Sequence, residues 1–108
     1  MCSSDLNFTA AYDLGQSYLE KKMTDEAAAA FRQSVNIANA YAQGHRALGE
    51  LLLSEGQVDE AVAELRKAAE LVPDDAGTHV ALARALTAKG LTGEAEQEMR
   101  KAGQAQPQ

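Results

Sequence analysis

Residues 42–75 read AQGHRALGELLLSEGQVDEAVAELRKAAELVPDD, and this stretch decides the fold. Its first half carries an apolar stripe at helical spacing, formed by His45, Leu48, Gly49 and Leu52. Its second half carries another, formed by Ala61, Val62, Leu65, Ala68, Ala69 and Leu71. Gly56 lies between the stripes, and glycine readily ends a helix because it has no Cβ to clash in the left-handed conformation. Pro73-Asp74-Asp75 ends the second stripe and supplies a cap for a following helix. The stretch therefore predicts a helical hairpin.

The pattern of this hairpin recurs when the chain is shifted by 34 residues in either direction. The matched columns include Leu14/Leu48/Leu82, Gly15/Gly49/Ala83, Glu26/Glu60/Glu94, Ala27/Ala61/Ala95 and Phe31/Leu65/Met99. The period defines units 8–41, 42–75 and 76–108, with helices expected near 9–21, 25–38, 43–55, 59–72, 76–89 and 93–104 and no strand. Because each hairpin buries its apolar face mainly against its neighbours, we predict an all-α superhelix, or solenoid, of three antiparallel helical hairpins.

The columns also predict how the hairpins pack. The three leucines at 14, 48 and 82 should occupy equivalent buried positions. The small residues Gly15, Gly49 and Ala83 should face Ala27, Ala61 and Ala95, so that the two backbones of a hairpin approach closely. Phe31 and Leu65 should fill the space between layers, whereas the last helix should present Glu96, Met99 and Gly103 to solvent.

The turns inside the hairpins are predicted from the same columns. Units two and three turn at Gly56 and Gly90, and the matching residue in unit one is Lys22. A faithful repeat therefore gives Lys22 a positive φ, which strains a residue that carries a Cβ. Thr24 and Thr92 are the expected caps of the second helices of units one and three, with Glu26 and Glu94 in the favourable first turns.

The middle unit resembles the tetratricopeptide repeat. The resemblance rests on His45-x-x-Leu48-Gly49-x-x-Leu52, followed by Gly56, Ala61, Leu65, Ala68 and Pro73, and its recurrence covers residues 8–108. The chain departs from the family pattern where Lys22 replaces a glycine and Asn39 a proline. The usual tryptophan is replaced by Ala11, His45 and His79. The resemblance implies a module that binds proteins or peptides.

The resemblance also implies a concave groove lined by the first helix of each hairpin. Its groove positions fall on Tyr12, Gln16, Leu19, Arg46, Glu50, Leu53, Val80, Arg84 and Thr87. An aromatic ring, two arginines and apolar patches suit an extended or helical peptide. We expect Arg46→Ala and Arg84→Ala to weaken binding with little change in stability. Members that grip acidic chaperone tails use Lys, Asn and Arg side chains, and the matching positions here hold Tyr12, Gln16, Ala47, Gly77 and Ala81. A chaperone tail is therefore not the expected ligand.

Composition and motifs exclude several other functions. The formal net charge is −6 and the basic residues are scattered, so no basic surface for nucleic acid is expected. The longest apolar run, 51–53, is too short to span a membrane. There is no phosphate-binding loop, no His-Glu-x-x-His and no activated nucleophile. His45 and His79 are interpreted as packed residues, because a third metal ligand is missing. We therefore predict no catalytic residue, no metal and no cofactor. The run Glu94, Glu96 and Glu98 is interpreted as a solvated face.

The first residues do not fit the repeat. Residues 1–6 back-translate to GTG TGC TCT TCC GAT CTn, which looks like the end of a common sequencing-library adapter. We therefore expect 1–7 to be a non-native or disordered leader, and the chain to be the C-terminal part of a longer bacterial protein. A genuine disordered terminus is one alternative. The other is a lipoprotein modified at Cys2, which is disfavoured because no lipid-anchor signal precedes that residue.

Three functions remain open at this stage. The favoured one is a binding scaffold for a protein or peptide, because the sequence predicts a groove and no catalytic groups. The second is a repeat segment of a larger protein whose upstream part is an enzyme. The third is self-association through the open N-terminal end. The sequence leaves the compartment open between cytoplasm and periplasm.

Overall fold

The computed structural model describes residues 8–105, and the predicted leader 1–7 lies outside this range. All regular secondary structure in this range is α-helical. Its helices are α1 (Phe8–Glu20), α2 (Thr24–Ile37), α3 (Ala42–Ser54), α4 (Val58–Leu71), α5 (Ala76–Ala88) and α6 (Thr92–Ala105). Every helix predicted from the 34-residue period is present, with ends displaced by one residue at most.

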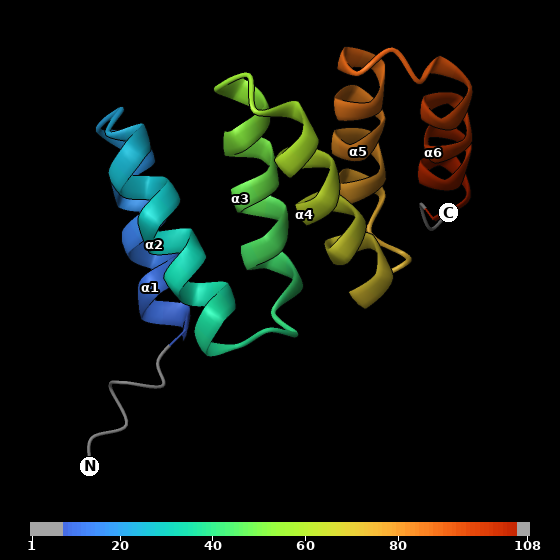
Figure 1. The fold of residues 1–108 in the computed structure, drawn as a ribbon. Helices are drawn as coiled ribbons and strands as arrows, with labels where there is room; N and C mark the ends of the chain where they lie inside the picture. The colour runs from blue at the N-terminus through green and yellow to red at the C-terminus, as the bar shows by residue number, and fades with distance from the viewer. Residues whose placement is uncertain (1–7, 106–108) are drawn as a thin grey trace.

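The helices form three hairpins that stand in a row, with α1 and α2 at one end and α6 at the other (Figure 1). Each helix packs most extensively against its hairpin partner, and consecutive hairpins meet through α2–α3 and α4–α5. The arrangement is elongated, with principal extents of 47 × 29 × 21 Å. The buried core runs along this row through all three hairpins. The predicted solenoid of antiparallel hairpins is confirmed.

Close packing inside a hairpin depends on glycine. A Cβ added to Gly49 would lie 2.6 Å from Cγ of Leu65 and 3.3 Å from the carbonyl oxygen of Ala61. A Cβ added to Gly15 would lie 2.5 Å from Cε1 of Phe31. The glycines thus make room chiefly for a large side chain of the facing helix. Phe31 and Leu65 therefore pack against the first helix of their own hairpin, and both are fully buried.

The corners between paired helices repeat faithfully. Lys22 has a φ of 63°, beside 87° at Gly56 and 90° at Gly90. At the first corner the N–H of Lys22 donates to the carbonyl of Leu19 at 2.9 Å, and the N–H of Met23 donates to that of Tyr18 at 2.8 Å. The other two corners make the same pair of bonds, which satisfy carbonyls at the helix end. The prediction of a positive φ at Lys22 is confirmed.

The helix caps differ from the prediction in two of three cases. Thr24 and Thr92 are the first residues of α2 and α6 and not the residues before them. The N-cap of α2 is Met23, which makes no side-chain cap. The cap predicted in the segment 73–75 is present: Asp75 accepts from the N–H of Gly77 at 3.1 Å. Threonines in these corners therefore gave a false capping signal.

Within residues 8–105, no further helix packs over either end of the row. Leu48 and Leu82 are 1% and 2% exposed, because α2 and α4 pack over them, but Leu14 is 46% exposed. The prediction of three equivalent buried leucines was wrong for Leu14, since no helix of residues 8–105 packs on the outer side of α1. At the other end Met99 is 50% exposed while Leu65 is fully buried, which confirms the prediction of a solvent-facing last helix.

Candidate functional site

Three adjoining hollows run along the molecule. The inner hollow, about 310 Å³, lies between α1 and α3, and the middle hollow, about 410 Å³, lies between α3 and α5. The end hollow, about 660 Å³, lies between α5 and α6. Glu50 lines both the inner and the middle hollow, and Arg84 lines both the middle and the end hollow. The hollows therefore follow one another along the first helices of the hairpins.

The groove residues predicted from the sequence line these hollows with one exception. Those in the inner hollow are Tyr12, Gln16, Leu19, Arg46 and Glu50. The middle hollow contains Glu50, Leu53 and Arg84, and the end hollow contains Arg84 and Thr87. Val80 is half-buried on α5 and lines none of the three.

Tyr12 is fixed in place by an aromatic cluster. Its ring centroid lies 5.6 Å from that of Phe31 and 5.4 Å from that of Tyr41. Gln16 donates from Nε2 to the Tyr12 hydroxyl at 2.7 Å. The pKa of Tyr41 is raised by burial, and further by Tyr12 and Asp13. One wall of the inner hollow is thus a rigid aromatic surface with a polar edge.

Arg46 has a structural role that the sequence did not reveal. Its Nε donates to Glu50 at 3.2 Å, and its Nη1 donates to Asp75, the cap of α5, at 3.3 Å. A Cβ on Gly77 would meet the guanidinium at 2.6 Å, so the group lies flat against the start of α5. Partial burial lowers the pKa of Arg46, but the two carboxylates outweigh it and raise that pKa. We therefore expect Arg46→Ala to lower stability, in contrast to the sequence-based expectation.

Asp75 is the acidic centre of this junction. Besides capping α5, its Oδ2 accepts from the hydroxyl of Thr78 at 2.7 Å. Burial raises the pKa of Asp75, but the bond from Thr78, the charge of Arg46 and the N–H of Gly77 outweigh burial and lower it. The ionised form of Asp75 is therefore the one that the fold stabilises.

Arg84 is chemically different from Arg46. Its side chain is exposed at the boundary of the middle and end hollows, and within residues 8–105 it makes no hydrogen bond or ion pair. The same is true of Arg100, which lines the end hollow from α6. An unpaired guanidinium can donate to a carboxylate without first breaking an internal contact.

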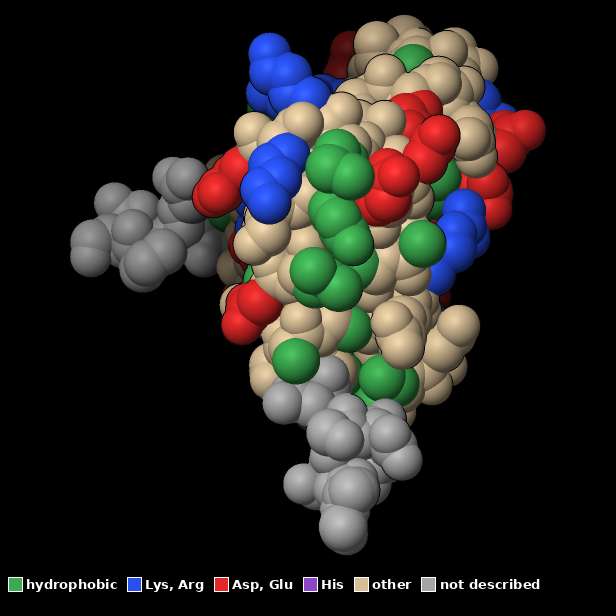
Figure 2. Space-filling model, turned by 90° about the vertical axis from the view of Figure 1, so that its left-hand side faces the viewer, with side chains coloured by type: hydrophobic (Ala, Val, Ile, Leu, Met, Phe, Trp, Pro, Cys, Tyr) green, Lys and Arg blue, Asp and Glu red, His purple; other side chains and the backbone are tan. Residues whose placement is uncertain are grey.

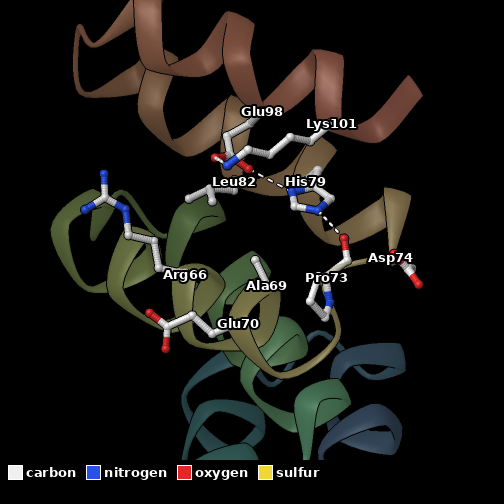
Figure 3. A pocket seen from close by; sticks show the side chains of 9 residues that line it. All are labelled: Arg66, Ala69, Glu70, Pro73, Asp74, His79, Leu82, Glu98 and Lys101. Atoms are coloured by element: carbon white, nitrogen blue, oxygen red, sulfur yellow. Dashed lines mark hydrogen bonds and ion pairs between the residues drawn. The ribbon is translucent and has the colours of Figure 1, made fainter. Parts of the chain in front are cut away.

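A fourth cavity, the outer pocket of about 490 Å³, lies between α4, α5 and α6 (Figure 3). His79 projects into it between two acceptors: Nδ1 lies 2.7 Å from Oε1 of Glu98, and Nε2 lies 2.7 Å from the carbonyl oxygen of Pro73. Lys101 contacts Glu98 at 3.2 Å. The expectation that Glu98 belongs to a solvated face was wrong, because its side chain is largely buried and paired.

The histidine contact is repeated in the middle hairpin. His45 lies 2.8 Å from Glu64 and 2.8 Å from the carbonyl oxygen of Asn39. A carbonyl only accepts, so Nε2 of each ring donates to the loop carbonyl, and Nδ1 has the glutamate as its partner. Each ring thus ties the second helix of its own hairpin to the loop that enters the hairpin. Both histidines are buried, as predicted.

Unit one lacks both partners of this contact. The residues that match His45 and Glu64 there are Ala11 and Ala30, and both alanines are buried. The sequence contained a signal for the pair that we did not use: each histidine precedes its glutamate by 19 residues in two units, and both are absent together in the third.

Residues 8–105, the part of the chain that the structure describes, contain neither a cluster of metal ligands nor a helix that could span a membrane. Among these residues, no three His, Cys, Asp or Glu side chains come together as a metal site would need. Within the same range no helix has the length and apolar character needed to cross a bilayer.

Two family models match the chain, and both describe the tetratricopeptide repeat. One covers residues 8–41 and the other covers 52–108, which is more than half of the chain. The chain belongs to the tetratricopeptide repeat family. Repeats of this family generally mediate protein–protein interaction and are typically non-catalytic scaffolds. A comparison with curated proteins found no match.

Solved structures of MamA have the same fold as this tetratricopeptide repeat chain. One is 24% identical with a TM-score of 0.86, and the match covers 91% of this chain and 57% of that one. A MamA R50E mutant is 24% identical with a TM-score of 0.84, over 94% of this chain and 74% of that one. The chain spans a little over half the length of the first two MamA chains that it matches. At this identity the likeness shows the fold alone.

Proposed function

We propose that this tetratricopeptide repeat chain is a scaffold that binds a peptide segment of another protein along its inner and middle hollows. The observation that supports the proposal most directly is the continuity of the hollows, because Glu50 lines two of them and Arg84 joins the second to the third. A row of shallow hollows along successive helices suits an extended ligand that places a side chain in each.

The composition of the hollows supports a ligand of mixed character. Tyr12 and Leu19 give the inner hollow apolar surface, and Leu53 gives the same to the middle hollow. Arg84 offers an unpaired cation to an acidic side chain or a terminal carboxylate, whereas Arg46 is already neutralised by Glu50 and Asp75. The ligand is therefore a peptide with apolar residues and an acidic group placed near Arg84.

A display selection tests this function. The purified protein is used to select peptides from a random library, and the affinity of an enriched peptide is measured by fluorescence anisotropy. Ala47→Trp should occlude the inner hollow, which Ala47 lines, and should weaken binding at least tenfold. Glu50→Trp, at a more exposed position of the same hollow, is the second variant.

Ala63→Trp is the matched control, because Ala63 is exposed on α4 and lines none of the three hollows. Circular dichroism checks that each variant stays helical. The proposal is refuted if no peptide is enriched, or if the enriched peptide binds both groove variants as tightly as it binds the control.

The alternative of an enzyme encoded upstream gains no support from the family models or from the similar structures. The other alternative, self-association, is favoured by specific contacts between the hairpins.

A further inference from the structure

One column of the repeat joins each hairpin to the next by an ion pair. Arg32 of α2 reaches Glu60 of α4 at 3.6 Å, and Arg66 of α4 reaches Glu94 of α6 at 2.8 Å. Both pairs run from the second helix of one hairpin to the first turn of the second helix of the following hairpin. The next arginine of the column is Arg100.

Arg100 and the glutamate at the other end of the column are both left without a partner. Arg100 is exposed on α6 and makes no ion pair within the described residues. Glu26 occupies in α2 the place that Glu60 and Glu94 occupy in the later hairpins, and it is also exposed without an ion pair in that range. Glu26 at one end of the row and Arg100 at the other are thus the two residues of an ion pair that successive hairpins form twice within the chain.

The two ends also expose the apolar surfaces that face each other where one hairpin packs on the next, at the α2–α3 and α4–α5 contacts. At the first end, Leu14 is 46% exposed where Leu48 and Leu82 are covered by α2 and α4. Figure 2 shows the side of the molecule on which α1 and α2 lie, where apolar side chains gather in a band bordered by charged ones. At the other end of the row, the apolar residues that line the end hollow are Ala83, Ala95 and Met99.

We propose that the chain stacks head to tail on further copies of itself, so that α1 and α2 of one copy cover α6 of another. In this stack Leu14 of one copy lies against the α6 face that carries Met99, and Glu26 of that copy pairs with Arg100. The contact repeats the α2–α3 and α4–α5 junctions in register, so the solenoid continues from copy to copy.

Such a contact joins two different surfaces and does not close on itself. The stack therefore grows with concentration and has no fixed size. One feature limits its strength: Glu96 stands in the α6 face where Ala28 and Val62 stand in the earlier hairpins. The stack covers Glu96, and among the described residues the basic side chains that line the same hollow are Arg84 and Arg100. The association is therefore weak and is favoured by high protein concentration and by low salt.

Sedimentation equilibrium of the whole 108-residue chain at concentrations up to about 1 mM tests the proposal. The wild-type protein should show an average mass that rises steadily above 11.5 kDa. Leu14→Glu should keep the mass at that of one chain. Arg100→Glu and Glu26→Arg should each weaken association about fivefold or more, because attraction becomes repulsion between like charges.

The decisive step is to mix the two charge variants in equal amounts. Arg100→Glu carries an acidic residue at its α6 end, and Glu26→Arg carries a basic residue at its α2 end. These two ends can pair with each other, so the mixture should recover association that neither variant shows alone. Lys67→Glu, an unpaired exposed residue of α4 with the same change in charge, is the control and should associate as wild type does.

Three results would overturn the proposal. The first is a wild-type mass that stays at one chain throughout. The second is association that Arg100→Glu leaves unchanged, which indicates a symmetric contact through α1. The third is a mixture of the two charge variants that associates no more than either variant alone.

Discussion

The buried contact between His45 and Glu64 gives the sharpest test of the packing, because unit one shows what the fold looks like without it. Glu64→Ala removes the carboxylate 2.8 Å from Nδ1 of a histidine whose side chain is 6% exposed. A buried polar atom left without a hydrogen-bond partner costs about 1–3 kcal/mol. His45→Ala removes the donor to the carbonyl of Asn39 and opens a cavity in place of the buried ring.

The double variant His45→Ala/Glu64→Ala copies the alanine pair that unit one carries at the same positions. The double variant has no buried Nδ1 that lacks a partner. Its loss of unfolding free energy should therefore be smaller than the sum of the losses in the two single variants. Coupling between contacting residues runs from about 0.5 to 3 kcal/mol, and we expect about 1–2 kcal/mol here.

Urea unfolding followed by helical circular dichroism measures the four free energies of this cycle. The exposed pair Arg32–Glu60, at 3.6 Å, serves as the control cycle and should couple by less than about 0.5 kcal/mol. Strictly additive losses for His45 and Glu64 would refute the reasoning, because the two side chains would then stabilise the fold independently.

Three further predictions follow from the turns, the end of the row and the cap of α5. Lys22→Gly should stabilise the protein by about 0.5 kcal/mol and Gly56→Lys should destabilise it by about 1 kcal/mol, because both positions have positive φ; a lower melting temperature for Lys22→Gly would contradict this. Leu65→Ala should cost about 2–4 kcal/mol in chemical denaturation and Met99→Ala clearly less, since Leu65 is fully buried and Met99 half exposed; equal losses would contradict it. The fold lowers the pKa of Asp75, so the ionised carboxylate should contribute fully to stability above the pKa of an unfolded Asp, about 4. This contribution should be lost as the pH falls through the lower pKa of Asp75 in the folded protein. Asp75→Asn should therefore flatten this part of a curve of unfolding free energy against pH.

The fold was predictable because the 34-residue period repeats both the apolar columns and the corner residues. Lys22 illustrates the strength of this signal: the column alone placed a lysine in a left-handed conformation, and the structure has it at a φ of 63°. A helical repeat is dominated by local contacts, so a column that holds in one unit holds in the next.

The failures at Leu14, Arg46 and Glu98 have one physical cause, which is that each depends on whether another element packs against the residue. Leu14 has the sequence environment of Leu48 but no helix over it. Arg46 has the sequence position of a groove residue, but Asp75, the cap of α5, engages it across 3.3 Å. The pairing of His79 with Glu98 was missed because helical periodicity describes a face, not the partner that the face meets.

Chemical-shift mapping tests the central claim most directly. A peptide enriched by the wild-type protein is titrated into the ¹⁵N-labelled chain, and the amide shifts are followed residue by residue. The account predicts that the largest changes cluster on α1, α3 and α5 around Gln16, Glu50 and Arg84, which line the hollows. Changes confined to the outer pocket, around Arg66 and Glu70, would contradict it.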